Sequence, residues 1–157
     1  MPSVSPHNAT PLDRILVIDD LPLIPIAFQE IFRSVNPSAL VEYSGNIFTA
    51  LSAKAYANTS FDLIITGSFQ EQHSTNLQFA VSELKKRFGR PRVMIYSSAY
   101  DPLIIEKMAG GDIDAYVHKY ESVDEIRKAY QHLSAGEPYV SGIFHTLYYD
   151  YGYGVRK

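Results

Sequence analysis

Short apolar runs alternate with longer amphipathic segments along most of the chain. In the run at 61–67, Leu63, Ile64 and Ile65 are apolar in succession. A strand that is covered on both faces has this pattern, and the crossover helices of a parallel sheet cover both of its faces. The runs that predict strands lie at 14–20, 39–44, 61–67, 92–98 and 115–119. We therefore expect 61–67 to be the central strand of a parallel sheet.

The segments that follow these runs have the spacing of amphipathic helices. They lie at 21–35, 47–57, 77–88, 102–109 and 122–135. The last segment has the clearest start, because Ser122 and Glu125 have the spacing of a capping box, in which each side chain accepts from a free backbone N–H. The strict alternation of strands and helices predicts an α/β fold with a doubly wound parallel sheet and right-handed crossovers.

The two ends of the chain differ from this pattern. Residues 1–11 contain three prolines and small polar residues, so we expect a disordered tail. Residues 12–138 form the predicted domain. The tyrosine- and glycine-rich segment 139–157 is predicted to be a linker or a C-terminal extension that packs on a neighbour. Four of its tyrosines form a cluster at positions 148, 149, 151 and 153, and tyrosine is enriched at protein interfaces.

Composition narrows the possible functions. A length of 157 residues fits one domain with a single core. The formal net charge of −3 gives no electrostatic footprint for nucleic acid, and the lack of cysteine excludes disulfides and thiolate metal sites. No run approaches the roughly 18 apolar residues of a membrane span, and the N-terminus lacks the pattern of a signal peptide. We expect a cytoplasmic protein that does not contact a membrane.

Polar side chains end three of the predicted strands. Asp19 and Asp20 end the first run, Ser97 is near the end of the fourth, and Lys119 ends the fifth. The carboxyl ends of parallel strands meet at one edge of the sheet, where such folds bind ligands. The central strand ends at the same edge in Gly67, which has no side chain to contribute.

Over about residues 12–141 the chain resembles a response-regulator receiver domain of the NarL/FixJ type, a component of two-component signalling. The matching residues are the acidic pair Asp19 and Asp20, Ser97, and Lys119, with Tyr116 in the place of the family's switch aromatic. The resemblance implies a flavodoxin-like five-stranded sheet of order 2-1-3-4-5 with helices on both faces. Residues 135–141 resemble the segment that leads toward a helix-turn-helix domain in that family.

The departure from the family lies at the phosphoacceptor position, where Gly67 replaces the expected aspartate. Phosphoryl transfer needs a nucleophile in line with the donor, and glycine has no side chain that could attack. We therefore expect no phosphoryl transfer to this position. Asp62 is a poor substitute, because it starts the same run and lies about 16 Å from position 67. With one carboxylate lost, Mg²⁺ should bind weakly or not at all. We expect Lys119 to pair permanently with Asp19 or Asp20.

These features together predict a non-enzymatic, atypical receiver that lacks a cofactor and acts in transcriptional regulation. It would work by phosphorylation-independent binding to itself, as a dimer, or to another regulator. DNA would be reached only through a helix-turn-helix domain that is not in this chain. An alternative is a small-molecule sensor, because Gly67 opens space at the strand ends. A flavodoxin-like enzyme is disfavoured, because Asp19 and Asp20 place acid where a phosphate cradle needs free N–H groups.

Overall fold

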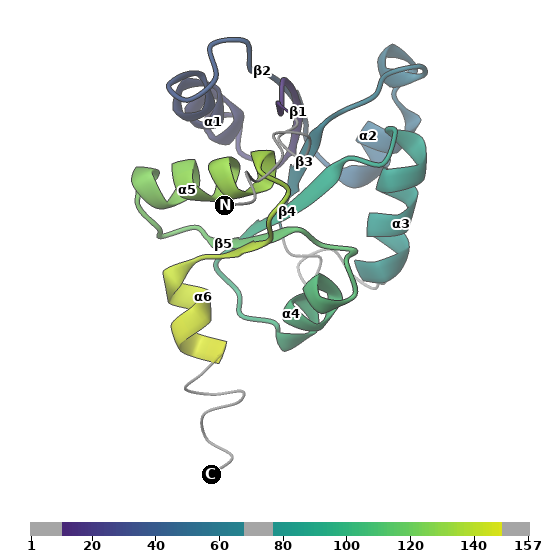
Figure 1. Cartoon of the computed structure of the whole chain (residues 1–157). Helices are drawn as coiled ribbons and strands as arrows, with labels where there is room; N and C mark the ends of the chain where they lie inside the picture. Colours follow the sequence, from purple (N-terminus) through teal and green to yellow (C-terminus); the bar gives the residue numbers. More distant parts are fainter. Residues whose placement is uncertain (1–10, 68–76, 149–157) are drawn as a thin grey trace, which may run out of the picture.

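The computed structural model describes residues 11–67 and 77–148, which form a sheet with helices on both faces (Figure 1). All neighbouring strands are parallel, in the order β2-β1-β3-β4-β5-β6. The strands are β1 (Arg14–Ile18), β2 (Leu40–Ser44), β3 (Leu63–Thr66), β4 (Arg92–Ser97), β5 (Ala115–His118) and β6 (Tyr139–Val140). The doubly wound α/β fold and the order of the first five strands are therefore confirmed.

Two apolar layers hold the helices against the sheet. One layer contains α1 (Leu23–Arg33) and α5 (Val123–Ser134). The other contains α2 (Ile47–Ser52), α3 (Leu77–Arg87), α4 (Pro102–Ala109) and α6 (Gly142–Leu147). Within β3, Ile64 packs in the α2–α3 layer, while Leu63 and Ile65 pack in the α1–α5 layer. This two-sided burial explains the unbroken apolar run at the centre of the chain.

The number of strands is the main correction to the prediction, since the sheet has six strands rather than five. Tyr139 and Val140 form β6 and pair in register with Ala115 and Tyr116 of β5. The helix α6 follows directly, so residues 139–148 continue the domain rather than forming a linker. A two-residue strand between Pro138 and Gly142 is too short to show a periodicity, which is why the sequence pattern does not reveal it. Tyrosines 149, 151 and 153 lie outside the described residues.

The start of α5 is a second, smaller correction. The Ser122 hydroxyl accepts from the backbone N–H of Glu125 at 3.2 Å, as a capping box requires. The Glu125 carboxylate does not complete the box. It accepts instead from the Tyr139 hydroxyl and from the backbone N–H of Gly142, 3.2 Å away. The Ser122 side chain therefore caps α5 as predicted, whereas the Glu125 side chain holds the segment that carries β6 and α6.

In the part of the chain that the structure describes, no helix combines the length and the apolar character needed to cross a membrane.

A shorter segment than predicted forms the second helix: α2 ends at Ser52, and a 3₁₀ turn (Lys54–Tyr56) continues the chain toward β3. Arg87 of α3 fixes this turn, because its guanidinium donates to the carbonyl oxygens of Tyr56 and Ala57 at 2.8 and 3.1 Å.

Candidate functional site

The carboxyl ends of β1, β3, β4 and β5 bring the predicted site residues to one edge of the sheet. Ile18 and Thr66 are in register, so Asp19 and Gly67 follow them at the same level. Lys119 follows β5, and its backbone N–H donates to the carbonyl oxygen of Ser97 at 3.1 Å. The expected edge therefore exists in the folded chain.

Lys119 forms an ion pair with Asp19 across this edge. Its Nζ lies 3.9 Å from Asp19 Oδ2, where the Asp19 side chain is 6% exposed and the Lys119 side chain 33% exposed. The other oxygen, Asp19 Oδ1, accepts from the backbone N–H of Leu21 at 2.8 Å and so fixes the turn into α1. The predicted pairing is confirmed for Asp19, whereas Asp20 is exposed. At 3.9 Å the contact is an ion pair that is too long for a hydrogen bond.

Neither the backbone conformation nor the described neighbours of Gly67 require a glycine at this position. Its φ lies outside the left-handed region. Among the described residues, a Cβ added there meets only the carbonyl oxygen of Tyr96, at 3.8 Å, which is an ordinary contact. Neither backbone strain nor crowding therefore accounts for the glycine, and what the site lacks is the chemistry of a side chain.

Ser97 and Tyr116 both hold the loop between β4 and α4. Ser97 is buried, and its Oγ accepts from the backbone N–H of Ala99 at 3.0 Å. The Tyr116 hydroxyl donates to the carbonyl oxygen of Ala99 at 2.5 Å and accepts from the backbone N–H of Asp101 at 2.9 Å. Burial is the main cause that raises the pKa of Tyr116 above its ordinary value, so the hydroxyl stays protonated and keeps both bonds.

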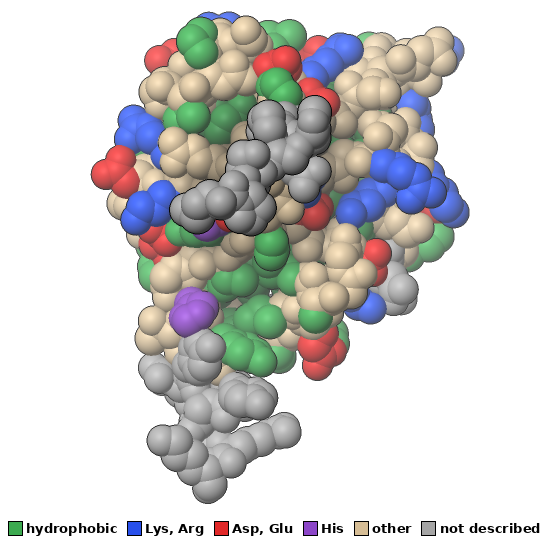
Figure 2. All heavy atoms as spheres, in the orientation of Figure 1, with side chains coloured by type: hydrophobic (Ala, Val, Ile, Leu, Met, Phe, Trp, Pro, Cys, Tyr) green, Lys and Arg blue, Asp and Glu red, His purple; other side chains and the backbone are tan. Residues whose placement is uncertain are grey.

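The ring of Tyr116 is held as firmly as its hydroxyl. It is fully buried and stacks on Phe144 of α6, with 3.7 Å between ring centroids and 17° between ring planes. His118, also on β5, lies against the same Phe144 ring at 4.9 Å between centroids. Figure 2 shows hydrophobic side chains gathered between α6 and α4 on the viewed face. Tyr116 is therefore held in an inward position by ring packing as well as by its hydroxyl bonds.

Removing the Tyr116 hydroxyl tests this loop anchor. We expect Tyr116→Phe to lower the free energy of unfolding by about 2 kcal/mol, because the carbonyl oxygen of Ala99 and the N–H of Asp101 both lose a partner. Urea unfolding measures the loss, and faster amide exchange at Asp101 locates it. Tyr120→Phe is the matched control, because Tyr120 is 82% exposed and should leave stability unchanged. Equal effects of the two variants would contradict the anchoring role.

Two acidic side chains fasten the start of α6, and the sequence pattern does not single them out for this role. Glu121 Oε1 accepts from the backbone N–H of Ile143 at 2.7 Å, and Glu125 Oε1 accepts from that of Gly142. Phe144 is the buried side chain that this arrangement places against β5. The only sequence signal for it is a single phenylalanine in a tyrosine- and glycine-rich segment.

The residues present do not fit a Mg²⁺ site. Such a site needs several oxygen ligands free to face the ion. Asp19 Oδ1 already accepts from the backbone N–H of Leu21, and Asp19 Oδ2 already pairs with Lys119 Nζ. Across the described residues no group of three His, Asp or Glu side chains could hold a metal. We therefore derive no chemistry through a bound metal.

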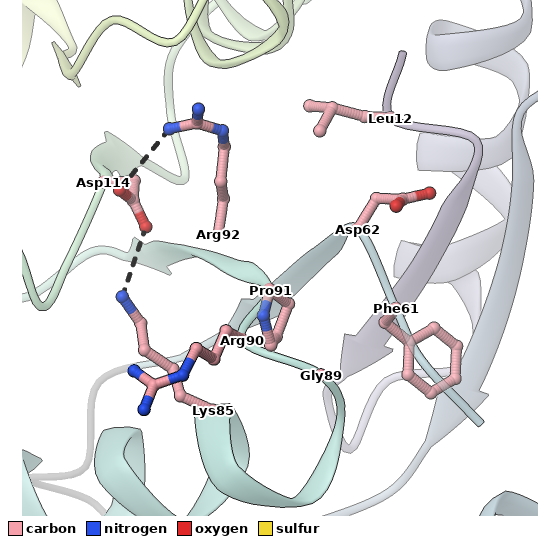
Figure 3. Close-up of a pocket in the computed structure, with 9 residues that line it drawn as sticks. All are labelled: Leu12, Phe61, Asp62, Lys85, Gly89, Arg90, Pro91, Arg92 and Asp114. Carbon is pink, nitrogen blue, oxygen red and sulfur yellow. Dashed lines mark ion pairs between the residues drawn. The ribbon is translucent and has the colours of Figure 1, made fainter. Parts of the chain in front are cut away.

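Asp62 lies at the opposite edge of the sheet, beside a pocket of about 360 Å³ (Figure 3). Its Oδ2 accepts from the backbone N–H groups of Asp13 and Arg14 at 3.1 and 2.9 Å, which ties β3 to the start of β1. Asp114, across the pocket, lies within 4 Å of two cations, Lys85 and Arg92. The acids of this pocket therefore have structural partners, and Asp62 is not placed to replace a side chain at position 67.

Comparison with known proteins supports the fold. No protein-family model and no curated protein matches the chain. Solved structures do match, among them a LuxR family DNA-binding response regulator from Silicibacter pomeroyi, with 19% identity, a TM-score of 0.65, and coverage of 82% of this chain and 97% of that one. The isolated REC domain of RcsB from Salmonella enterica serovar Typhimurium, solved with phosphomimetic BeF3⁻, has 15% identity, a TM-score of 0.65, and coverage of 85% and 96%.

A third match is the structure of two RcsB dimers bound to two parallel DNAs, with 17% identity and a TM-score of 0.65. The match covers 85% of this chain and 66% of that one. At these identities the likeness concerns the fold. The chain has the fold of the receiver domains of response regulators, extended by β6 and α6.

Proposed function

We propose that this chain is an atypical receiver domain that acts in signalling and transcriptional regulation through protein contacts, without phosphorylation. The observation that carries the proposal is Gly67 at the end of β3, at the level of Asp19, whose carboxylate pairs with the Lys119 amine. A receiver transfers a phosphoryl group to a carboxylate at this point, and a glycine offers no atom that can attack. Two neighbouring hydroxyls in the described residues are poor substitutes, because Thr66 is buried and the Ser97 Oγ accepts a hydrogen bond from the backbone N–H of Ala99.

The internal contacts support a domain that keeps one conformation. The amine of Lys119 already has a carboxylate partner, and Tyr116 is already packed inward by Phe144. Both contacts are made by side chains of the chain itself, which supports a partner surface that does not depend on a phosphoryl group. RcsB occurs in dimers bound to DNA. By analogy the partner here is a second copy or another regulator, and contact with DNA would need an additional domain.

The direct test is exposure of the protein to a phosphodonor. We expect acetyl phosphate with Mg²⁺ to leave the intact mass of the chain unchanged and to leave its sedimentation coefficient unchanged as well. A receiver domain that carries the acceptor aspartate, treated in the same way, shows that the reagent is active. A stoichiometric, base-labile adduct on this chain would overturn the proposal, and mapping the adduct would identify the acceptor.

A further inference from the structure

The helix α1 is apolar on both its inner and its outer side. Phe28 and Phe32 pack inward against the sheet, but Leu23 and Ile26 point outward and are 76% and 62% exposed. The neighbouring helix α5 has instead a polar outer side, with Asp124 among its exposed residues. Glu30 and Arg33 are exposed farther along α1, so the outward apolar side chains belong to the first half of the helix. Apolar side chains on the outer side of a surface helix are normally covered.

A hollow of about 400 Å³ lies beside this stripe, between α1 and β2. Apolar and aromatic side chains form most of its wall: Pro22, Pro25, Ile26, Val41 and Tyr43. No lysine or arginine lines it, and Glu30 is the one charged residue of the lining. The hollow is therefore suited to an apolar side chain from a partner rather than to an anion.

The backbone of β2 is closed to a partner at this point, although β2 is the outermost strand on its side of the sheet. The Gln29 side chain donates to the carbonyl oxygen of Ala39 and accepts from the N–H of Val41, both at 2.9 Å. An added strand would need these same groups. The amide of Gln29 occupies them, so whatever covers this surface must meet side chains.

We propose that this surface, made of the outer side of α1 and the exposed side chains of β2, binds a second copy of the same chain. Leu21 and Leu23, 55% and 76% exposed, flank Pro22 of the hollow's wall in the sequence, and we call these two side chains the ridge. A ridge next to a hollow of the same chemistry is self-complementary, because a two-fold axis places each ridge opposite the partner's hollow. The inference rests on the proposed function and names its partner and surface.

The exposed area agrees with a dimer. Leu21, Leu23, Ile26, Leu40 and Tyr43 together leave roughly 600 Å² of surface exposed, taking about 200 Å² for a large side chain. A standard interface buries about 800 Å² on each partner, and flanking polar residues can supply the difference. This area is at the upper end of the largest apolar patches that monomers expose, and such patches often serve in contacts.

Sedimentation equilibrium of the whole chain over a range of concentrations tests the proposal. We expect the wild type to dimerise reversibly, and Ile26→Glu to raise the dimer Kd by about 100-fold or more, since a charge would enter the buried centre of the contact. Phe79→Glu is the matched control. Phe79 is 61% exposed, close to the 62% of Ile26, but lies on α3 in the other layer. We expect it to change Kd less than about threefold. Leu23→Glu provides a second variant of the ridge, and thermal unfolding checks that each variant is folded.

A wild type that stays monomeric at every concentration would overturn the inference, as would a dimer that tolerates both Ile26→Glu and Leu23→Glu. Equal weakening by Phe79→Glu would also overturn it, because the contact would then lie elsewhere. These results differ from a failure of the proposed function, which shows as a phosphoryl adduct after acetyl phosphate. If the wild type stays monomeric and takes up no phosphoryl group, this inference fails but the proposed function stands, with another protein as the partner.

Discussion

The Gly67→Asp variant is expected to accept one phosphoryl group from acetyl phosphate in the presence of Mg²⁺, whereas the wild-type chain accepts none. Among the described residues, a Cβ added at position 67 meets only the carbonyl oxygen of Tyr96, at 3.8 Å, so they leave room for a side chain. The new carboxylate would stand at the level of Asp19, with the amine of Lys119 at the same edge. One oxygen of this carboxylate would attack phosphorus, and acetate would leave.

Mg²⁺ should also begin to affect the stability of this variant. A third carboxylate beside Asp19 and Asp20 increases the repulsion at the strand ends, and a bound divalent cation relieves it. Because a ligand that binds only the folded state raises its stability, Mg²⁺ should raise the Tm of Gly67→Asp and leave that of the wild type unchanged. Differential scanning calorimetry with and without the ion measures the difference.

Gly67→Asn is the matched control for both measurements. Its side chain has nearly the same shape, but the amide is a poor nucleophile and adds no charge, so neither an adduct nor a shift with Mg²⁺ is expected. A Gly67→Asp variant that folds and yet stays unmodified would show that more than the acceptor has been lost. The long contact between Lys119 and Asp19 would then be the first feature to examine.

The central part of the fold could be predicted from the sequence because its signals are local. Leu63, Ile64 and Ile65 are apolar in succession, and a strand buried on both faces requires that pattern. The polar residues at the strand ends could be brought together as well, because parallel strands end at a common edge. The pairing of Lys119 with Asp19 rather than Asp20 needed coordinates, since it depends on which carboxylate points over the sheet.

The C-terminal extension of the sheet could not be predicted, because its signals are tertiary. Two residues of β6 carry no periodicity, and α6 has six residues with a single fully buried side chain. The contacts that position them join residues far apart in sequence, such as Phe144 with Tyr116 and Gly142 with Glu125. Glu125 has the spacing of a capping box, so the sequence predicted a bond at the start of α5 rather than its bonds to Tyr139 and Gly142.

Removing the ring of Phe144 tests whether this extension is an integral part of the domain. We expect Phe144→Ala to lower the free energy of unfolding by about 3–5 kcal/mol, the usual cost of deleting a fully buried aromatic ring. The loss includes the stacking on Tyr116, whose ring would then border a cavity. Urea unfolding followed by circular dichroism measures the change, and faster amide exchange in 139–148 and at the end of β5 locates it.

Phe48→Ala is the control for this measurement, because Phe48 is 70% exposed on α2 and should change stability by less than about 0.5 kcal/mol. If Phe144→Ala were as mild as the control, residues 139–148 would be a loosely attached linker, and the inward position of Tyr116 would depend on its hydroxyl bonds alone. If the large loss is found, α6 stabilises the same tyrosine that the β4–α4 loop needs. The site edge and the C-terminal extension would then form one cooperative unit, in which the position of Tyr116 is set by packing rather than by phosphorylation.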